Sequence, residues 1–571
     1  MCSKERLTWE FFIISVLFLT FKIYKEDDCV SNLEKPDYDA VVIGAGFSGL
    51  YMLHSLRENG YSVKVFEKAA DVGGTWYWNR YPGARCDSDS IYYNFTFSEE
   101  LFKGWTWSSR YPEQPEILAY LNYVADTLNL RDGIQFNTTV TSAKYDEDKN
   151  MWNIETDDGN CVTATYFITA VGCLSAANIP DFKGLDSFEG EWYHTGRWPH
   201  EKVDFSGKRV GVIGTGSSGV QAIPVIAKEA KHLTVFQRTP QYSFPARNHP
   251  YDPEFVQKAK ENFAQLKKEL RESFAGQIIK SRKYSALDDT PEERQKAYEA
   301  RWQEGGYLFV YEDLLINEES NKTAQDFIRS KIAEIVKDPK TAKKLMPNYL
   351  WGTKRQIIDT DYYETYNRDN VRLVDVRENP IVEITPKGIK TTAEELELDI
   401  IVFATGYDGM TGPLFKMDIR GRNGVSLKEK WEDGASTRTY LGLSTNGFPN
   451  MFMITGPESP SVLSNMPISI EQHVEWIQDC LNYMRDRDYH LIEANEQAEN
   501  EWSNHVRELA EQTLYVKTDS WYMGANIEGK PRRFPIYVGG VGTYREKCDE
   551  IAKNGYEGFD FESSKTHASQ V

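Results

Sequence analysis

The sequence predicts an α/β protein with two Rossmann-like dinucleotide-binding domains, one inserted within the other. Two glycine fingerprints of the form GxGxxG support this prediction, at 44–49 and at 214–219. Each follows a short apolar run, at 39–43 and 209–213, which is typical of a strand, a tight turn and a helix N-terminus. Helices that begin in this way bind a pyrophosphate. The 571 residues are also too many for one compact core.

Charged residues of opposite sign stand at similar distances behind the two fingerprints. Glu67 follows Gly44 by 23 positions, and Arg238 follows Gly214 by 24 positions. Both lie at the end of the second predicted strand of their unit. A carboxylate accepts a hydrogen bond from a bare ribose hydroxyl, whereas a guanidinium suits a 2′-phosphate. We therefore expect FAD in the first site and NADP(H) in the second.

The composition excludes several classes of protein. The net charge of −20 disfavours nucleic acid as a partner, because such binding needs a basic face. The seven cysteines are odd in number and include no CxxC pair. A disulfide framework and a dithiol reductase are therefore both disfavoured. The HExxH motif does not occur, and we predict no metal site.

The N-terminus contains the one membrane-like stretch of the sequence. Residues 7–24 make 18 positions of mostly apolar character if Glu10 and Lys22 lie at the interfaces, which is the lower limit for a span. The flank at 22–28 lacks the small-residue cleavage site of a signal peptide. We expect a membrane anchor with a cytosolic catalytic body, or otherwise a cytoplasmic protein. An interfacial segment and a signal peptide are the alternatives.

The predicted domains follow one another along the chain. A returning strand at 165–172 closes the first unit, and apolar residues spaced by three and four positions predict helices at about 250–347. The run at 398–406 resembles the returning strand, which indicates that the chain goes back to the FAD domain. We assign 1–35 to the hydrophobic segment and linker, 36–175 and 380–560 to a discontinuous FAD domain, 176–379 to the NADP domain with its helical insertion, and 561–571 to a tail.

Two further motifs narrow the function. Residues 188–199, FEGEWYHTGRWP, resemble the FxGxxxHxxxWP signature of Baeyer-Villiger monooxygenases, and residues 73–87 resemble that family's second pattern, (A/G)GxWxxxx(F/Y)P(G/M)xxxD. The resemblance runs from about Pro36 to Gly558. It implies an enzyme that uses FAD, NADPH and dioxygen to insert one oxygen atom beside the carbonyl of a small apolar ketone, giving an ester or lactone. His194 in the signature is expected to be structural, as a lone histidine beside aromatic residues usually is.

The resemblance also places an active-site arginine. Arg355 precedes an Asp-Tyr-Tyr segment at 361–363, as the family's arginine does. From the residues alone, Lys354 and Arg355 are typical of a solvated surface pair. A guanidinium does not lose its proton, so it stabilises the negative charge that develops when dioxygen reacts at the flavin. Asp87 is implied to approach this arginine.

The remaining cofactor-binding residues combine the glycine turns with what the resemblance adds. The FAD site is expected to comprise Gly44, Gly46, Ser48, Gly49, Glu67, Thr75, Trp76, Trp78, Asp87, Tyr93, Val140 and Met466. The NADP site is expected to comprise Gly214, Gly216, Ser217, Ser218, Gly219, Gln221, Arg238, Thr239, Lys354, Arg355 and Trp521. The loop at 456–466 resembles a substrate-side loop of the family but differs from a relative at Glu458 and Val462, as does the adjacent Pro467. These differences put any direct transfer of substrate preference in doubt.

Two other functions fit parts of the sequence. Flavin monooxygenases that oxygenate nitrogen or sulfur share a related signature, but it usually lacks the ending that Trp198 and Pro199 form here. A membrane-anchored flavin-binding protein without turnover would not need Asp87, Arg238 and Arg355, which are all present. Both alternatives are therefore disfavoured.

Overall fold

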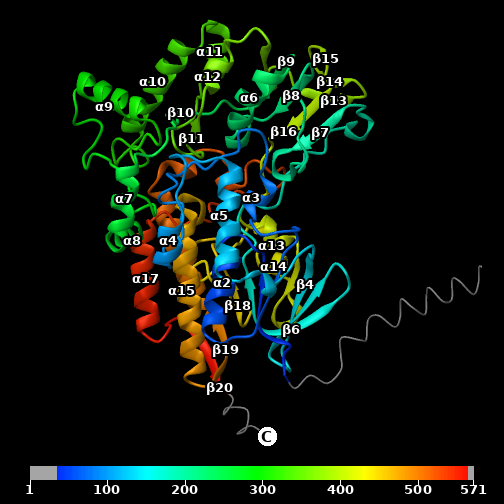
Figure 1. Cartoon of the computed structure of the whole chain (residues 1–571), viewed down its shortest axis with the longest axis vertical. Coiled ribbons are helices and arrows are strands. Elements are labelled where there is room, and N and C mark those ends of the chain that lie inside the picture. Colours follow the sequence, from blue (N-terminus) through cyan, green and yellow to red (C-terminus); the bar gives the residue numbers. More distant parts are fainter. Residues whose placement is uncertain (1–34, 564–571) are drawn as a thin grey trace, which may run out of the picture.

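The computed structural model describes residues 35–563, which form a lower and an upper body (Figure 1). The lower body contains an eight-stranded sheet in the order β17-β4-β5-β6-β1-β2-β3, with β18 beside β6. Its strands are β1 (Tyr38–Ile43), β2 (Val63–Phe66), β3 (Ile134–Gln135), β4 (Val140–Asp146), β5 (Met151–Thr156), β6 (Cys161–Thr169), β17 (Asp418–Arg420) and β18 (Met451–Met453). The predicted returning strand is β6, which pairs in parallel with β1.

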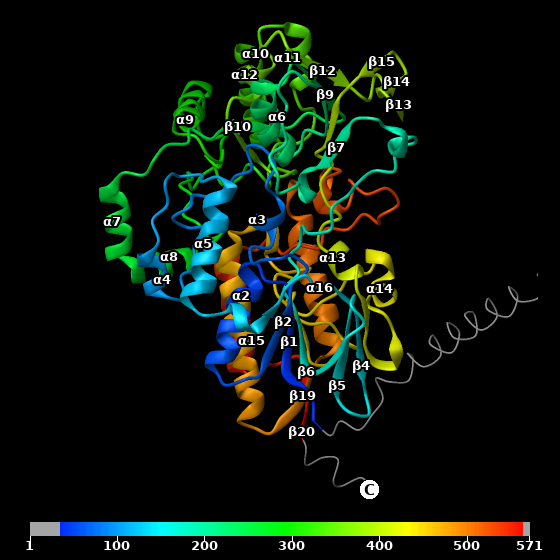
Figure 2. The ribbon, with the colours of Figure 1, turned by 45° about the vertical axis from the view of Figure 1, so that its right-hand side comes forward.

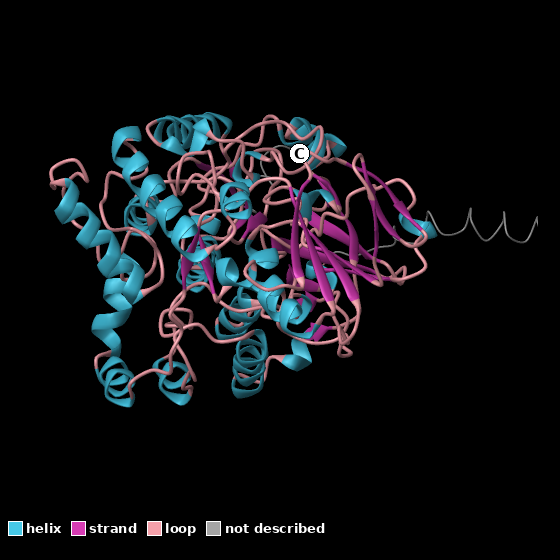
Figure 3. Cartoon of the chain, turned by 90° about the horizontal axis from the view of Figure 1, so that it is seen from above, coloured by secondary structure: helices cyan, strands magenta, loops and turns pink. Residues whose placement is uncertain are grey.

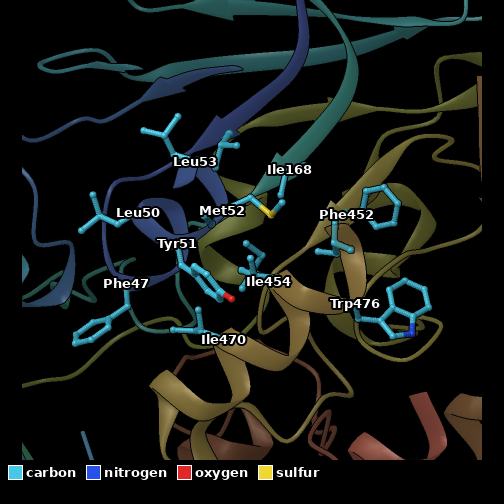
Figure 4. Packing of buried hydrophobic residues seen from close by; sticks show 14 of the residues in the cluster. Phe47, Leu50, Tyr51, Met52, Leu53, Ile168, Phe452, Ile454, Ile470 and Trp476 are labelled. Carbon is cyan, nitrogen blue, oxygen red and sulfur yellow. The ribbon is translucent and has the colours of Figure 1, made fainter. Parts of the chain in front are cut away.

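Two helices from distant parts of the chain cover this sheet. Helix α2 (Phe47–Glu58) follows the first glycine turn, and α15 (Met466–Arg485) packs beside it. Leu50 and Leu53 recur at helical spacing and are fully buried. Figure 4 shows their surroundings, where Ile168 of β6, Phe452 of β18 and Trp476 of α15 belong to the same apolar core. This core holds the helix N-terminus, and with it the glycine turn, against the strand ends.

The upper body is built on a second sheet in the order β12-β9-β8-β16-β7, in which all strands run parallel. Its strands are β7 (Glu191–His194), β8 (Arg209–Ile213), β9 (His232–Gln237), β12 (Val371–Asp375) and β16 (Ile400–Phe403), and α6 (Ser217–Glu229) follows the second glycine turn. The lower sheet is mixed, since β5 pairs antiparallel with β4 and β6, but the strands on either side of β1 run parallel to it. The upper sheet is parallel throughout, and the two sheets, each with its glycine turn, confirm the predicted fold class.

The placement of the apolar run at 398–406 was wrong. Its strand, β16, pairs in parallel with β7 and β8 and so belongs to the upper sheet. Each dinucleotide unit has its own returning strand, β6 in one and β16 in the other, and their similar composition does not reveal which sheet they join. The chain enters the lower sheet only at β17, which pairs with β4. The second part of the lower body therefore starts after β16, beyond the predicted boundary at 380.

The predicted insertion consists of helices that extend from the upper body. They are α7 (Pro253–Glu261), α8 (Phe263–Glu272), α9 (Pro291–Glu304), α10 (Glu318–Ile335) and α11 (Pro339–Leu345). Helices α7 and α8 run down beside α4 (Glu99–Gly104) of the lower body (Figure 2). The view from above shows strands and helical arms on opposite sides (Figure 3). Lys260 of α7 donates to the carbonyl oxygen of Lys103 at 2.8 Å, which links the two bodies.

The predicted tail begins too early. Strand β20 (Phe559–Ser563) pairs antiparallel with β19 (Tyr489–Ala494), and the ring of Phe561 stacks on that of Tyr489. The other elements are α3 (Thr75–Trp78), α4 (Glu99–Gly104), α5 (Gln114–Thr127), β10 (Ser243–Pro245), β11 (Ile357–Asp359), α12 (Tyr362–Thr365), β13 (Ile381–Thr385), β14 (Gly388–Thr391), β15 (Glu395–Glu397), α13 (Gly412–Phe415), α14 (Leu427–Lys430), α16 (Glu496–Glu511) and α17 (Val541–Lys553).

Candidate active site

The first glycine turn is a cradle that a larger residue would fill. Gly44 has a φ of +105°, in the left-handed region, and a Cβ on it would lie 2.6 Å from the carbonyl oxygen of Ala170. A Cβ on Gly49 would lie 1.7 Å from the carbonyl oxygen of Gly44. Within the described chain, no side chain caps α2, whose N-cap is Gly46. Its first N–H groups and the close turn fit the pyrophosphate of FAD.

Glu67 follows β2 and directs its carboxylate back to this turn. Its side chain is buried, and its two oxygens accept backbone N–H bonds from Ala45 at 2.6 Å and from Ala69 at 2.7 Å. Burial raises the pKa of Glu67, and the two hydrogen bonds oppose that rise. The carboxylate thus lies beside the first glycine turn, and its role as a ribose acceptor stays a prediction. It also fixes the glycine turn, a role for which the sequence has no signal.

The aromatic segment at 73–87 lies directly on the first turn. A Cβ on Gly74 would lie 2.9 Å from the Cα of Gly46, and the N–H of Gly73 donates to the carbonyl oxygen of Ala45 at 3.0 Å. Trp76 donates its indole N–H to the hydroxyl of Tyr93 at 3.1 Å. The other residues predicted for this site are Ser48 in the first turn of α2, Thr75 and Trp78 in α3, Val140 at the start of β4 and Met466 at the start of α15.

The second glycine turn repeats the geometry of the first. Gly214 has a φ of +108°, and a Cβ on it would lie 2.4 Å from the carbonyl oxygen of Ala404. A Cβ on Gly216 would meet no described atom within 4 Å, so this position leaves open space beside the turn. Helix α6 begins at Ser217 and Ser218, and within the described residues no side chain caps it. This turn therefore fits a second pyrophosphate.

Three cationic side chains gather at the edge of the upper sheet. Arg238 follows β9, and Arg377 follows the adjacent strand β12 and donates to the hydroxyl of Thr239 at 2.9 Å. Burial, together with the charges of Arg238 and Arg377, lowers the pKa of Lys354 to about 8. Like charges repel one another, so a cluster of this kind fits an anion such as a 2′-phosphate. Arg377 was not predicted from the sequence. Its place just after an apolar run, like that of Arg238, is the one feature of the sequence that could have indicated it.

Gln221 links the two dinucleotide units. It lies in α6 of the upper body and accepts a hydrogen bond from the hydroxyl of Tyr81 at 2.8 Å. Its amide donates to the carbonyl oxygen of Arg85 at 3.2 Å, and a Cβ on Gly83 would lie 2.5 Å from its own carbonyl oxygen. The helix that begins at the second glycine turn therefore packs on the aromatic segment of the first site.

Arg355 and Asp87 meet between the two units. The Nε and Nη2 atoms of Arg355 donate to the Asp87 carboxylate at 3.0 and 2.8 Å. Nη1 donates to the carbonyl oxygen of Val462 at 2.7 Å, and Nη2 donates to the hydroxyl of Tyr307 at 3.2 Å. Burial disfavours the charged guanidinium, but Asp87 and the neighbouring tyrosines outweigh it, so the pKa of Arg355 lies well above its ordinary value. The contact with Tyr307, from the insertion, was missed.

Trp521 lies in an apolar cluster next to this ion pair. Its ring approaches Gly409, where a Cβ would lie 3.4 Å away, and it contacts the ring of Tyr522 at a centroid distance of 4.3 Å. The same cluster includes Val462 and Met466. The structure therefore brings Trp521 close to Val462, whose carbonyl oxygen accepts a hydrogen bond from Arg355.

His194 ends strand β7 and is 1% exposed. Its Nδ1 atom accepts the N–H of Gly196 at 3.0 Å, and burial lowers the pKa of the imidazole to about 4. The ring lies edge-on to Tyr407. These contacts are structural in character, and His194 touches neither glycine turn through them.

The predicted membrane segment, 7–24, lies outside the described residues. Within 35–563, no helix combines the length and the apolar character that crossing a bilayer requires.

Comparison with known proteins finds relatives that match most of the chain. A family model described as flavin-binding monooxygenase-like matches residues 38–289. A Baeyer-Villiger monooxygenase from Pseudooceanicola batsensis is 47% identical over 91% of this chain and 95% of its own length. A phenazine N-monooxygenase from Lysobacter antibioticus is 45% identical over 92% of this chain and 97% of its own length. A solved structure of an oxidised steroid monooxygenase bound to NADP has a TM-score of 0.88 and 49% identity, and the match covers 92% of this chain and 100% of that one.

Proposed function

The chain belongs to the Baeyer-Villiger monooxygenase family, and we propose that Arg355 carries the chemistry of that family between the two dinucleotide sites. The enzyme uses FAD and NADPH to insert one oxygen atom of dioxygen next to a ketone carbonyl. A ketone, dioxygen, NADPH and one proton give an ester or lactone, NADP⁺ and water. The bound cofactors supply the hydride and the activation of dioxygen.

The contacts of Arg355 support this role. A guanidinium has five N–H donors. Among the described residues, Asp87, Val462 and Tyr307 engage four of them, two at Asp87 and one at each of the others. The second N–H on Nη1 takes part in none of these four bonds, and Tyr522 is a further side-chain neighbour of the guanidinium. In this proposal that N–H binds negative charge that develops on oxygen. Such a donor is most effective when it is already fixed in place, and here three partners fix it.

The neighbouring residues have binding and positioning roles in this proposal. Asp87 orients Arg355 through both carboxylate oxygens. Glu67 would accept a hydroxyl of the FAD ribose. Arg238 and Lys354 would bind the 2′-phosphate of NADPH. The apolar cluster around Trp521 suits an apolar ketone, because its side chains exclude water from the substrate.

One experiment tests the role of Arg355. Purified holoenzyme is incubated with NADPH and linear, cyclic, aryl and steroid ketones, a thioether and an aromatic N-heterocycle, and the products are identified by mass. Arg355→Ala should still consume NADPH but form ester at least about 100-fold more slowly. Arg422→Ala is the control, because Arg422 also forms an ion pair, with Glu493 at 2.8 Å, but makes no contact with Arg355. Normal ester formation by Arg355→Ala would refute the assignment.

Oxygenation of nitrogen is the second candidate function. The observation that favours it is the similar phenazine N-monooxygenase. An N-oxide as the main product of the same panel would support it, and an ester or lactone would support the first function.

Attachment to a membrane through residues 7–24 is a separate proposal. It rests on the apolar composition of that stretch and on no contact within the described residues. It concerns where the enzyme works and leaves the reaction unchanged.

A further inference from the structure

Glu458 is a buried carboxylate in the substrate-side loop, which we define as residues 456–466. It is 1% exposed, although an acidic side chain is rarely buried without partners. Its φ is +67°, a left-handed conformation that residues other than glycine seldom adopt. A left-handed backbone and a buried carboxylate at one position persist only where the surrounding structure holds them, and such positions are common at functional sites.

The carboxylate of Glu458 is fully engaged. One oxygen accepts from the guanidinium of Arg533 at 2.9 Å, and the other accepts from the N–H of Thr439 at 2.8 Å. The hydroxyl of Ser503 lies within 2.8 Å of both oxygens. Arg533 is the one cationic partner among these groups and comes from a different part of the chain.

Arg533 belongs to the segment that carries Trp521, which we define as residues 513–537. The backbone joins this segment to the substrate-side loop at the same place, because the N–H of Glu458 donates to the carbonyl oxygen of Pro535 at 2.8 Å. The N–H of Tyr537 donates in turn to the carbonyl oxygen of Ser459 at 3.0 Å. One ion pair and two backbone hydrogen bonds therefore connect the loop and the segment.

The same loop reaches Arg355 only a few residues later. Val462, four positions after Glu458, places its carbonyl oxygen 2.7 Å from Nη1 of Arg355. Asp87 and this carbonyl together set the plane of the guanidinium, and with it the direction of the remaining N–H on Nη1. A contact that fixes Glu458 therefore also constrains the proposed catalytic donor.

We propose that the buried ion pair of Glu458 and Arg533 is a positioning device that couples the Trp521 segment to the orientation of Arg355. When the segment lies against the loop, the pair forms and the Val462 carbonyl is fixed. Where the pair is broken, the Val462 carbonyl is held less firmly, and so is the guanidinium of Arg355 that donates to it. This inference rests on the proposed role of Arg355, and it adds residues outside the cofactor sites to the control of oxygen insertion.

The test compares Glu458→Gln and Arg533→Met with Glu493→Gln in the holoenzyme. Glu493 is the matched control, because it also ties a backbone N–H, of Gly447 at 2.8 Å, and an arginine, Arg422 at 2.8 Å, but lies in β19. In the first two variants, the ester formed per NADPH consumed should fall about three- to tenfold, with a matching rise in hydrogen peroxide. The rate of NADPH-dependent flavin reduction should stay within about twofold. Arg533→Lys, which keeps the charge, should recover most of the coupling.

Hydrogen exchange provides a readout that does not depend on turnover. Amides of 459–463 and of 514–537 should exchange about tenfold faster in Glu458→Gln and Arg533→Met, and at the wild-type rate in Glu493→Gln. If Glu458→Gln does not fold, the Arg533→Met variant decides the test alone. In that variant, the carboxylate of Glu458 still accepts hydrogen bonds from Thr439 and Ser503. Unchanged exchange, or an equal loss of coupling in the control, would overturn the inference. Absence of any ester from the wild-type enzyme would instead refute the proposed function, and the exchange result would still stand.

Discussion

Binding of NADP⁺ should weaken above pH 8, because Lys354 loses its proton there. Burial and the charges of Arg238 and Arg377 lower the pKa of this amine to about 8 in the free protein. A bound 2′-phosphate favours the protonated amine and raises its pKa, so affinity is fully present below pH 8 and falls as the pH rises. The protonated fraction at pH 9 is about one-tenth of that at pH 7, so the dissociation constant should rise about tenfold over this range.

Calorimetric titration of the holoenzyme with NADP⁺ from pH 6.5 to 9.5 measures this change. Lys354→Arg is the matched control, because its guanidinium keeps its proton and should give a nearly constant affinity over the same range. NAD⁺, which lacks the 2′-phosphate, should also show little dependence on pH. The assignment of Lys354 to the phosphate would be wrong if wild-type affinity were constant, or if Lys354→Arg retained the same slope.

Three further outcomes are expected. Arg238→Ala should weaken NADPH binding by about 1.5 to 3 kcal/mol and leave NADH binding nearly unchanged, and equal losses in a titration of both would refute the role of Arg238. Burial raises the pKa of Asp359 to about 7, so its contribution to the free energy of unfolding is largest below its unfolded pKa of about 4 and decreases up to pH 7. In denaturant titrations, the free energy of unfolding of the wild-type protein should fall by at most roughly 4 kcal/mol between pH 4 and 7 through this group, and Asp359→Asn should lack this fall. A variant with the same pH profile as the wild type would contradict this. Deletion of residues 1–30 should release the enzyme from membranes in a flotation assay, and unchanged partitioning would place the anchor elsewhere.

The parts of the fold that the sequence predicted are local. Each glycine turn carries its own strand, its own helix and, at the end of the next strand, its own charged residue. Glu67 and Arg238 lie after β2 and β9 as expected, because strand spacing within one unit is set by short connections. The sheet that β16 joins depends instead on contacts between distant segments, and a buried apolar run fits either sheet.

The site was harder to predict, because its partners come from separate parts of the chain. Arg377 follows a strand that pairs with β9 only in the folded sheet. Tyr307 lies in the insertion and reaches Arg355 across 48 positions. From the sequence, Glu458 was noted only as a difference from a relative in a substrate-side loop, whereas the structure buries it beside Arg533. Nothing local in the sequence indicates this partner, because Arg533 lies 75 positions away along the chain.

The ion pair of Arg355 and Asp87 depends on how the two bodies lie relative to each other. Asp87 belongs to the aromatic segment on the first glycine turn, and Arg355 precedes β11 of the upper body. Gln221 crosses the same boundary through its contacts with Tyr81 and Arg85. A rotation of one body that opened these contacts would separate Arg355 from Asp87 as well. The residue that we expect to bind the developing charge is thus correctly oriented only in the arrangement in which the second glycine turn packs on the first site. Oxygen insertion is therefore expected to need this placement of the two bodies.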